Sequence, residues 1–163
     1  MNATTDPLSD PLSVKAPGIL LGIGLGGFFD GIFLHQIFQL HHMFSSRISP
    51  DTVPGLRMNT LGDGFFHTVT WLAVLVGLGL LYSRVTHARR QVWSSPMLWG
   101  WMLNGWGWFN LVEGLIDHQI LGIHHVYADA DWFLWDMLFL ASGVIFILAG
   151  RAIARRAEPI VIA

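Results

Sequence analysis

The sequence contains no cysteine, and charged residues make up only 12% of it. The absence of cysteine excludes disulfide bonds, thiolate metal sites and CxxC redox chemistry. The charged fraction is about half of the roughly 25% that soluble domains carry, whereas hydrophobic residues reach 53%. The sequence also lacks a basic patch with interleaved aromatic residues, so we expect no nucleic-acid partner. This composition predicts a protein whose main solvent is a lipid bilayer.

Four apolar stretches follow a polar tail at residues 1–15. The tail lacks the basic start and apolar core of a signal peptide. Each apolar stretch reaches the roughly 20 residues that a membrane-spanning helix needs. We predict an all-α transmembrane domain over residues 16–152, followed by a second tail at residues 153–163. The predicted helices are residues 17–43, 64–83, 96–126 and 131–151.

Positive charge is concentrated on alternate connections between these stretches. One connection carries Arg84, Arg89 and Arg90, and the C-terminal end carries Arg151, Arg155 and Arg156. Because cytoplasmic loops have an excess of Lys and Arg, we expect both termini in the cytoplasm, and Lys15 agrees with this orientation. The connections at residues 44–63 and 127–131 then face outward.

A motif in the first apolar stretch recurs in the third at an offset of 83 residues. Asp30-Gly-Ile-Phe-Leu-His-Gln-Ile-Phe-Gln-Leu-His-His becomes Glu113-Gly-Leu-Ile-Asp-His-Gln-Ile-Leu-Gly-Ile-His-His. Six of the thirteen positions are identical, including all three histidines. Because an even number of membrane crossings separates the copies, they run in the same direction. The predicted fold is a four-helix bundle made of two like-oriented helical hairpins, related by a pseudo-twofold axis along the membrane normal.

Ionisable residues inside a membrane cost roughly 2.5–3.5 kcal/mol each on insertion scales. The motif places several of them within the predicted spans, and the second and fourth helices add more near their outward ends. Such residues face the bundle interior and pair with one another or mark a functional site. We predict that they form a metal site in the outward half of the membrane. The candidate ligands are Asp30, His35, His41, His42, His67, Glu113, Asp117, His118, His124, His125 and Asp136.

Histidine and carboxylate ligands without thiolate suit Fe, Cu, Zn or Mn. Residues six or seven apart on one α-helix are about 9–10.5 Å apart along its axis. This is too far to share one ion, whose bonds are about 2.0–2.2 Å long, so we expect two layers of ligands. The inner layer holds Asp30, His35, Glu113, Asp117 and His118, and the outer layer holds His41, His42, His124 and His125 with His67 and Asp136.

Three classes of function remain open on the residues alone. The chain binds metal for metal handling or for assembly of a respiratory oxidase, it is a membrane metalloenzyme, or it is a b-type cytochrome. The His-His pairs are similar to the histidine boxes of membrane di-iron desaturases and hydroxylases, although those boxes have shorter His spacings. His35 and His118 occupy equivalent positions on different helices, as two axial ligands of haem b would. Catalysis, a membrane-protein partner and a homo-oligomer all remain open.

The strings GGFFDGIFLHQIFQLHH and NLVEGLIDHQILGIHH resemble a bacterial family of predicted four-helix membrane proteins that is catalogued as a domain of unknown function. The resemblance covers about residues 15–155. It implies a bacterial inner-membrane location and an association with cytochrome oxidase assembly proteins. It implies no activity and no site residues, so the candidate site rests on the residues themselves.

Overall fold

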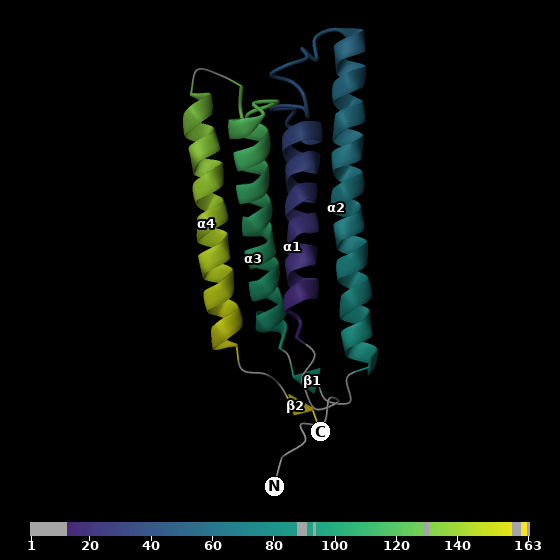
Figure 1. Cartoon of the computed structure of the whole chain (residues 1–163), viewed down its shortest axis with the longest axis vertical. Coiled ribbons are helices and arrows are strands. Elements are labelled where there is room, and N and C mark those ends of the chain that lie inside the picture. The colour runs from purple at the N-terminus through teal and green to yellow at the C-terminus, as the bar shows by residue number, and fades with distance from the viewer. Residues whose placement is uncertain (1–12, 88–90, 93, 129–130, 158–160, 163) are drawn as a thin grey trace.

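The computed structural model describes residues 13–87, 91–92, 94–128, 131–157 and 161–162, and over these residues it is all-α with four long helices (Figure 1). Two helices are extended at one end by a π-helical segment. The α-helices are α1 (Lys15–Phe29), α2 (Val53–His87), α3 (Ser95–Glu113) and α4 (Trp132–Arg156), and the π-helices are η1 (Asp30–Ile37), which continues α1, and η2 (Gly114–Ile120), which continues α3. The two-residue strands β1 (Gln91–Val92) and β2 (Val161–Ile162) pair antiparallel at the end of the molecule where α1 begins.

α1 and α3 form the central pair, with α2 packed against α1 and α4 packed against α3 (Figure 1). The central helices run in the same direction, and the outer helices return. A Cβ on Gly22 would meet the backbone of Met102, and a Cβ on Gly105 would meet the backbone of Ile19. Small residues of this kind let helix backbones approach closely in lipid. The two helices that carry the repeated motif are therefore neighbours at the centre of the molecule.

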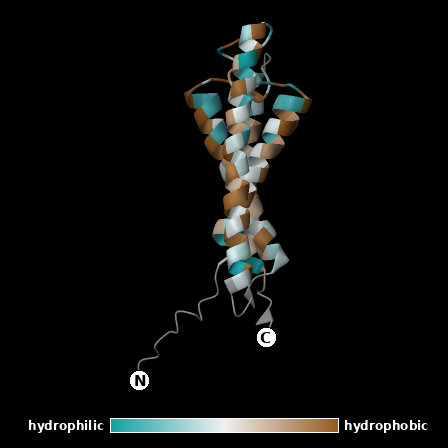
Figure 2. Ribbon diagram, turned by 90° about the vertical axis from the view of Figure 1, so that its right-hand side faces the viewer, coloured by the Kyte–Doolittle hydropathy of each residue, from teal (hydrophilic) through white to brown (hydrophobic). Residues whose placement is uncertain are grey.

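Three helices of the described chain are long and apolar enough to cross a membrane, namely Lys15–Ile37, Val53–Thr86 and Trp132–Arg156. The most apolar stretch of α2 is only 11% buried inside the protein and that of α4 17%, against 50% for α1. Figure 2 shows apolar residues along the middle of the helices and hydrophilic residues toward their ends. The outer helices therefore present their apolar side chains to lipid. α3, which corresponds to the third of the four predicted spans, has 19 residues and lies between α1 and α4.

The helices begin and end at residues that differ from the predicted ones. The first helix ends at Ile37 rather than at residue 43, and the third ends at Ile120 rather than at residue 126. α2 begins at Val53, so the prediction of a loop throughout residues 44–63 is wrong for its second half. With 35 residues, α2 is about 52 Å long, and its first turns project beyond the ends of α1 and α3 (Figure 1).

Both π-helices end in the same kind of turn. Gln39 (φ 49°) and Gly122 (φ 53°) have the left-handed conformation that commonly follows the last helical residues. The N–H of Phe38 donates to the carbonyl of Phe33, and the N–H of Leu121 donates to the carbonyl of Ile116, both at 2.8 Å. The chain turns back at these points. The two His-His pairs therefore lie on the connections after the helices and not on the helices themselves.

Candidate metal centre

Six side chains from the two copies of the motif converge at the end of the bundle opposite the β1–β2 pair. They are Asp30, His35, His41, Glu113, His118 and His124, and each is at most 5% exposed. Two groups have their donor atoms within 4.8 Å of one another, close enough to hold a metal ion. The first group is His35, His41 and His124, and the second is Glu113, His118 and His124.

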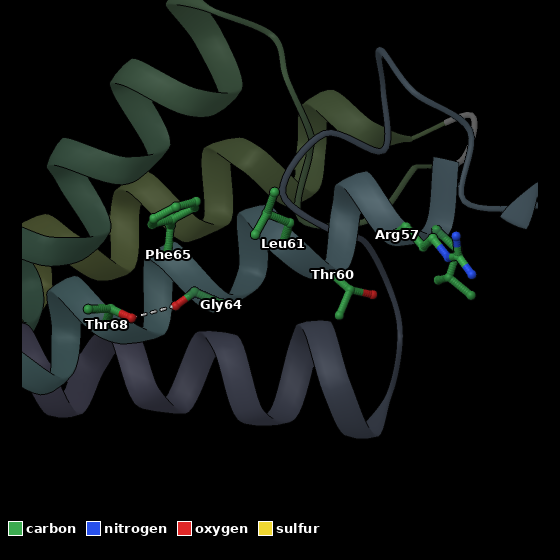
Figure 3. Close-up of a pocket in the computed structure, with 7 residues that line it drawn as sticks. Arg57, Thr60, Leu61, Gly64, Phe65 and Thr68 are labelled. Carbon is green, nitrogen blue, oxygen red and sulfur yellow. Dashed lines mark hydrogen bonds between the residues drawn. The ribbon is translucent and has the colours of Figure 1, made fainter. Parts of the chain in front are cut away.

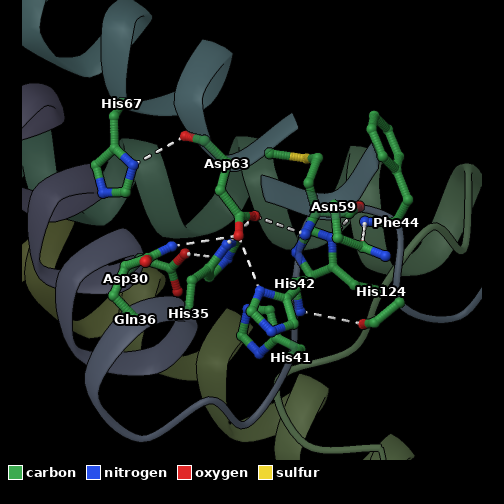
Figure 4. A network of polar contacts seen from close by, with 12 residues as sticks. Asp30, His35, Gln36, His41, His42, Phe44, Asn59, Asp63, His67 and His124 are labelled. Atoms are coloured by element: carbon green, nitrogen blue, oxygen red, sulfur yellow. Dashed lines mark hydrogen bonds and ion pairs between the residues drawn. The ribbon is translucent and has the colours of Figure 1, made fainter. Parts of the chain in front are cut away.

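In the first copy, the π-helix brings Asp30 and His35 together. Residues five apart on an α-helix point about 140° apart, whereas a π-helix repeats at i→i+5. His35 Nε2 accordingly lies 3.1 Å from Asp30 Oδ2. The ring centroid of His41 is 4.4 Å from that of His35, and His41 Nε2 is buried without a hydrogen-bond partner. Figure 4 shows these residues gathered between the helices and the connection after η1.

In the second copy, one carboxylate oxygen reaches two imidazoles. Glu113 Oε1 lies 2.9 Å from His118 Nε2 and 2.8 Å from His124 Nε2. Glu113 is one methylene longer than Asp30, its counterpart in the motif, and its second oxygen, Oε2, is buried without a hydrogen-bond partner. One oxygen of Glu113 is therefore in direct contact with both imidazole donors of its group.

Asp63, on α2, accepts hydrogen bonds from several residues of the first copy of the motif and of the connection after it. Asp63 is 1% exposed and accepts hydrogen bonds from His35 Nδ1 (2.8 Å), His42 Nδ1 (2.9 Å) and the N–H of Met43 (2.8 Å). The side-chain amide of Gln36 is a fourth donor, at 3.3 Å. Figure 4 shows Asp63 between these donors. Asp63 is absent from the predicted ligands, yet it fixes which nitrogen of His35 faces the cluster.

Asp136 on α4 has the corresponding position in the second copy. It accepts hydrogen bonds from His125 Nδ1 (2.7 Å), Gln119 Nε2 (2.8 Å) and the N–H of Val126 (3.1 Å). Its Oδ1 also lies 3.2 Å from His118 Nδ1. Asp136 thus contacts the Nδ1 atoms of His118 and His125, which point away from the cluster. These contacts fix the orientation of the two rings.

The aromatic residues three positions after these aspartates could have revealed Asp63 in the sequence. The Phe66 ring stacks on His35 with centroids 5.6 Å apart, and the Phe139 ring lies 5.4 Å from His118. Asp63-x-x-Phe66 on the second helix therefore matches Asp136-x-x-Phe139 on the fourth. This short repeated pattern indicates that Asp63 and Asp136 have equivalent positions in the two halves, although it is weaker than the repeated histidine motif.

Two histidines are each anchored by the other half of the chain. His41 Nδ1 donates to the carbonyl of Val126 (2.9 Å), and His124 Nδ1 donates to the carbonyl of Met43 (3.1 Å). Their rings stack with centroids 4.7 Å apart and planes 7° apart. The prediction that His41 and His124 form a separate outer layer is wrong, because the turns after η1 and η2 bring both rings among the predicted inner residues.

The hydrogen-bond acceptors define the state of several rings. His124 faces Met43 O through Nδ1 and Glu113 Oε1 through Nε2, and His35 faces Asp63 and Asp30 in the same way. A neutral imidazole has only one N–H, so a neutral ring that donates from Nδ1 presents its Nε2 lone pair to the carboxyl oxygen, and a proton or a metal ion must be shared between the two atoms. Burial holds the pKa of His41 well below its usual range, and this neutral ring, with Nδ1 donating to Val126, has a free Nε2 lone pair.

The cluster contains more acidic side chains than permanently basic ones. Asp30, Asp63, Glu113 and Asp136 are all buried, whereas no lysine or arginine is buried in the described parts of the chain. Buried carboxylates must be paired or must coordinate a metal. These carboxyl groups are therefore neutralised by protons of their own, by protonated histidines or by bound metal ions.

The other predicted ligands lie around the cluster. His42 and His125 contact Asp63 and Asp136 through Nδ1, and their side chains are 13% and 18% exposed. His67 donates from Nδ1 to the carbonyl of Asp63 (2.8 Å) and lies against Gly31, where a Cβ would meet its ring. Asp117 is half-buried on η2, outside both groups of close donors.

A surface hollow of about 640 Å³ lies away from the histidines, on the outer side of α2 (Figure 3). Its lining includes Leu61, Phe65 and Arg57. Phe65 is 67% exposed, so in a bilayer this hollow is in contact with lipid. The polar chemistry of the described chain is instead concentrated in the buried cluster.

Comparison with known proteins gives one match. A family model with the description "Predicted membrane protein (DUF2243)" matches residues 17–157, which include all four helices almost completely. No curated protein and no solved structure matches the chain.

Proposed function

The chain belongs to the family described as predicted membrane proteins (DUF2243), and we propose that it binds transition-metal ions within the membrane, in the buried His/carboxylate cluster. The observation that carries this proposal is the orientation of the imidazoles. His35, His41 and His124 donate from Nδ1 to a carboxylate or a carbonyl and direct Nε2 into the cluster. Metal-binding histidines almost always donate their second ring N–H in this way.

The composition of the cluster favours Fe, Cu, Zn or Mn over other metals, because its donors are imidazole nitrogens and carboxylate oxygens. Unpartnered buried atoms, including His41 Nε2 and Glu113 Oε2, provide the lone pairs that an ion needs. Haem b ligated by His35 and His118 is disfavoured, because both His41 and His124 lie between those two rings. The centroid distances are 4.4 and 5.6 Å to His35, and 6.4 and 4.8 Å to His118.

The proposed physiological role is metal handling or assembly of a respiratory oxidase in a bacterial inner membrane. The family resemblance supports this role, and the donor set of the cluster supports the binding of a metal ion. A membrane metalloenzyme is the second candidate. The six potential ligands need not fill every coordination position of the bound metal, so a substrate or water could occupy one of them. Turnover that depends on oxygen or on a reductant would distinguish this enzyme from a metal-handling protein.

The proposed membrane arrangement has four spans and cytoplasmic termini. α3 is shielded from lipid on two sides by α1 and α4, so it can cross the membrane with polar residues that a lipid-facing helix would not tolerate. Arg84, Arg151 and Arg155 lie near one end of the helices, which favours that end for the cytoplasm, while Arg89 and Arg90 lie outside the described residues. We also propose that the two hairpins are an internal repeat, because equivalent contacts recur in both halves.

Metal analysis of the full chain, purified in detergent without chelator and then loaded with Zn²⁺, Mn²⁺ or Fe²⁺, tests the proposal. We expect bound metal that survives gel filtration and that is lost in the double variant His35→Ala, His118→Ala. The matched control is His87→Ala at the far end of α2, which should bind as the wild type does. Equal metal content in the double variant and in the wild type would refute the proposal.

A further inference from the structure

The five donors of the two groups, taken together, are too far apart to bind a single metal ion. Zinc bonds to nitrogen and oxygen are about 2.0–2.2 Å long, so two ligands of one ion are at most about 4.4 Å apart. The donor atoms of each group lie within 4.8 Å of one another, but the five donors of both groups do not form one such set, and the two groups share only His124. One imidazole Nε2 has one lone pair and binds one ion. The groups therefore describe two neighbouring positions.

The assignment of His124 follows from its contacts. Its Nε2 lies 2.8 Å from Glu113 Oε1, and the same oxygen lies 2.9 Å from His118 Nε2. Glu113, His118 and His124 therefore form one trio. The remaining donors are Asp30, His35 and His41, of which Asp30 and His35 are already 3.1 Å apart. Each trio contains a carboxylate and two histidines, and each comes from one copy of the motif.

The charge of the cluster fits two divalent ions. Asp30, Asp63, Glu113 and Asp136 contribute about four negative charges when ionised, with no buried lysine or arginine in the described chain to balance them. Two divalent ions supply four positive charges, and the site becomes neutral in a medium where a net charge is costly. A single divalent ion would leave two negative charges, which protons on the carboxyl groups or on the histidines would have to balance.

We propose, on the basis of the metal-binding function proposed above, that the cluster holds two divalent transition-metal ions of unequal affinity. One ion binds to the trio of Glu113, His118 and His124, and the second binds to the trio of Asp30, His35 and His41. The Glu113 trio binds first, because its carboxylate oxygen already lies between both Nε2 atoms. The Asp30 trio binds second, because His41 Nε2 still lacks a partner and must move toward Asp30 and His35.

Stoichiometric titration of the metal-free full chain with Mn²⁺ tests this proposal, read by elemental analysis and by electron paramagnetic resonance. We expect two ions per chain, with affinities that differ at least tenfold. The first equivalent should give the signal of an isolated Mn²⁺, and the second should broaden and weaken it through coupling between the ions. This measurement uses the wild-type protein, so it does not depend on any variant folding.

Two variants assign the positions. His41→Ala should retain one ion with the affinity of the tight site, whereas Glu113→Gln should lose the tight step and keep at most one weak ion. Variants that elute from gel filtration as the wild type does are compared. One ion per wild-type chain would overturn the two-ion proposal and leave the metal-binding function intact, and no ion under any condition would refute both. Loss of both ions in His41→Ala would likewise overturn the two separate trios.

Discussion

Asp63→Asn is a sensitive test of how the cluster is held, because the side chain keeps its shape and loses its charge. Asp63 Oδ1 accepts from His35 Nδ1 and from the N–H of Met43, and Oδ2 accepts from His42 Nδ1 and Gln36. Asparagine has one acceptor oxygen and one amino group. Two of the four donors therefore lose their acceptor, at a cost of about 1–3 kcal/mol for each donor left buried.

The loss should appear mainly in metal affinity. Removing a hydrogen-bond partner of a metal-binding histidine typically costs about 10–100-fold in affinity, which corresponds to about 1.4–2.8 kcal/mol. Competition between the purified protein and a chelator of known affinity measures this change for Zn²⁺. We expect the larger effect at the position that contains His35, because Asp63 orients that ring and not His124.

Asp51→Asn is the matched control, since Asp51 is exposed and, among the described residues, its hydrogen bonds are with Ser49 in the same connection. It should leave the Zn²⁺ affinity unchanged. An Asp63→Asn protein that folds and binds Zn²⁺ within twofold of the wild type would show that Asp63 does not orient a metal ligand. This result would also remove the main support for His35 as a metal ligand.

Two further predictions concern the membrane arrangement and the helix packing. Alkaline phosphatase and green fluorescent protein fusions after residues 50, 88 and 163 should report outside, inside and inside, because the arginine-rich ends stay in the cytoplasm; an outside signal at residue 88 would invert the proposed orientation. Gly22→Val should lower the apparent melting temperature in detergent, because a Cβ there meets the backbone of Met102 and overpacking costs about 1–3 kcal/mol or more. Gly79→Val is its control, since a Cβ at Gly79 meets nothing within 4 Å; equal melting temperatures for the two variants would contradict the close α1–α3 contact.

The helices and the chemistry of the site could be predicted from the sequence because both depend on local signals. Apolar stretches of sufficient length indicate helices in lipid, and the structure has one helix at each. Buried ionisable residues in such helices must be satisfied by partners, and His35, Glu113 and His118 are indeed buried together. The identity of these residues could therefore be read from the chain without knowledge of the packing.

The position of each histidine along the bundle axis could not be predicted in the same way, because it depends on where the helix ends. Gly122 is a residue that favours the left-handed turn, but its counterpart Gln39 is not, so the repeated motif resembled a continuous helix in both copies. The π-helical spacing also has no established sequence pattern, yet it brings Asp30 to His35. Asp63 was left out of the candidate ligands because its hydrogen bonds depend on the contact of α2 with η1, which only tertiary packing establishes.

The exchange of hydrogen bonds between His41 and Val126 and between His124 and Met43 has a consequence for how the protein is made. Neither half can complete its own part of the cluster during synthesis, because His41 and His124 each donate to a carbonyl of the other half. If the second hairpin entered the membrane upside down, its motif would arrive at the opposite face, and His41 and His124 would both lose the carbonyl to which they donate. Correct orientation of both hairpins is therefore a condition for stability, and mis-inserted chains should be the ones that membrane proteases remove.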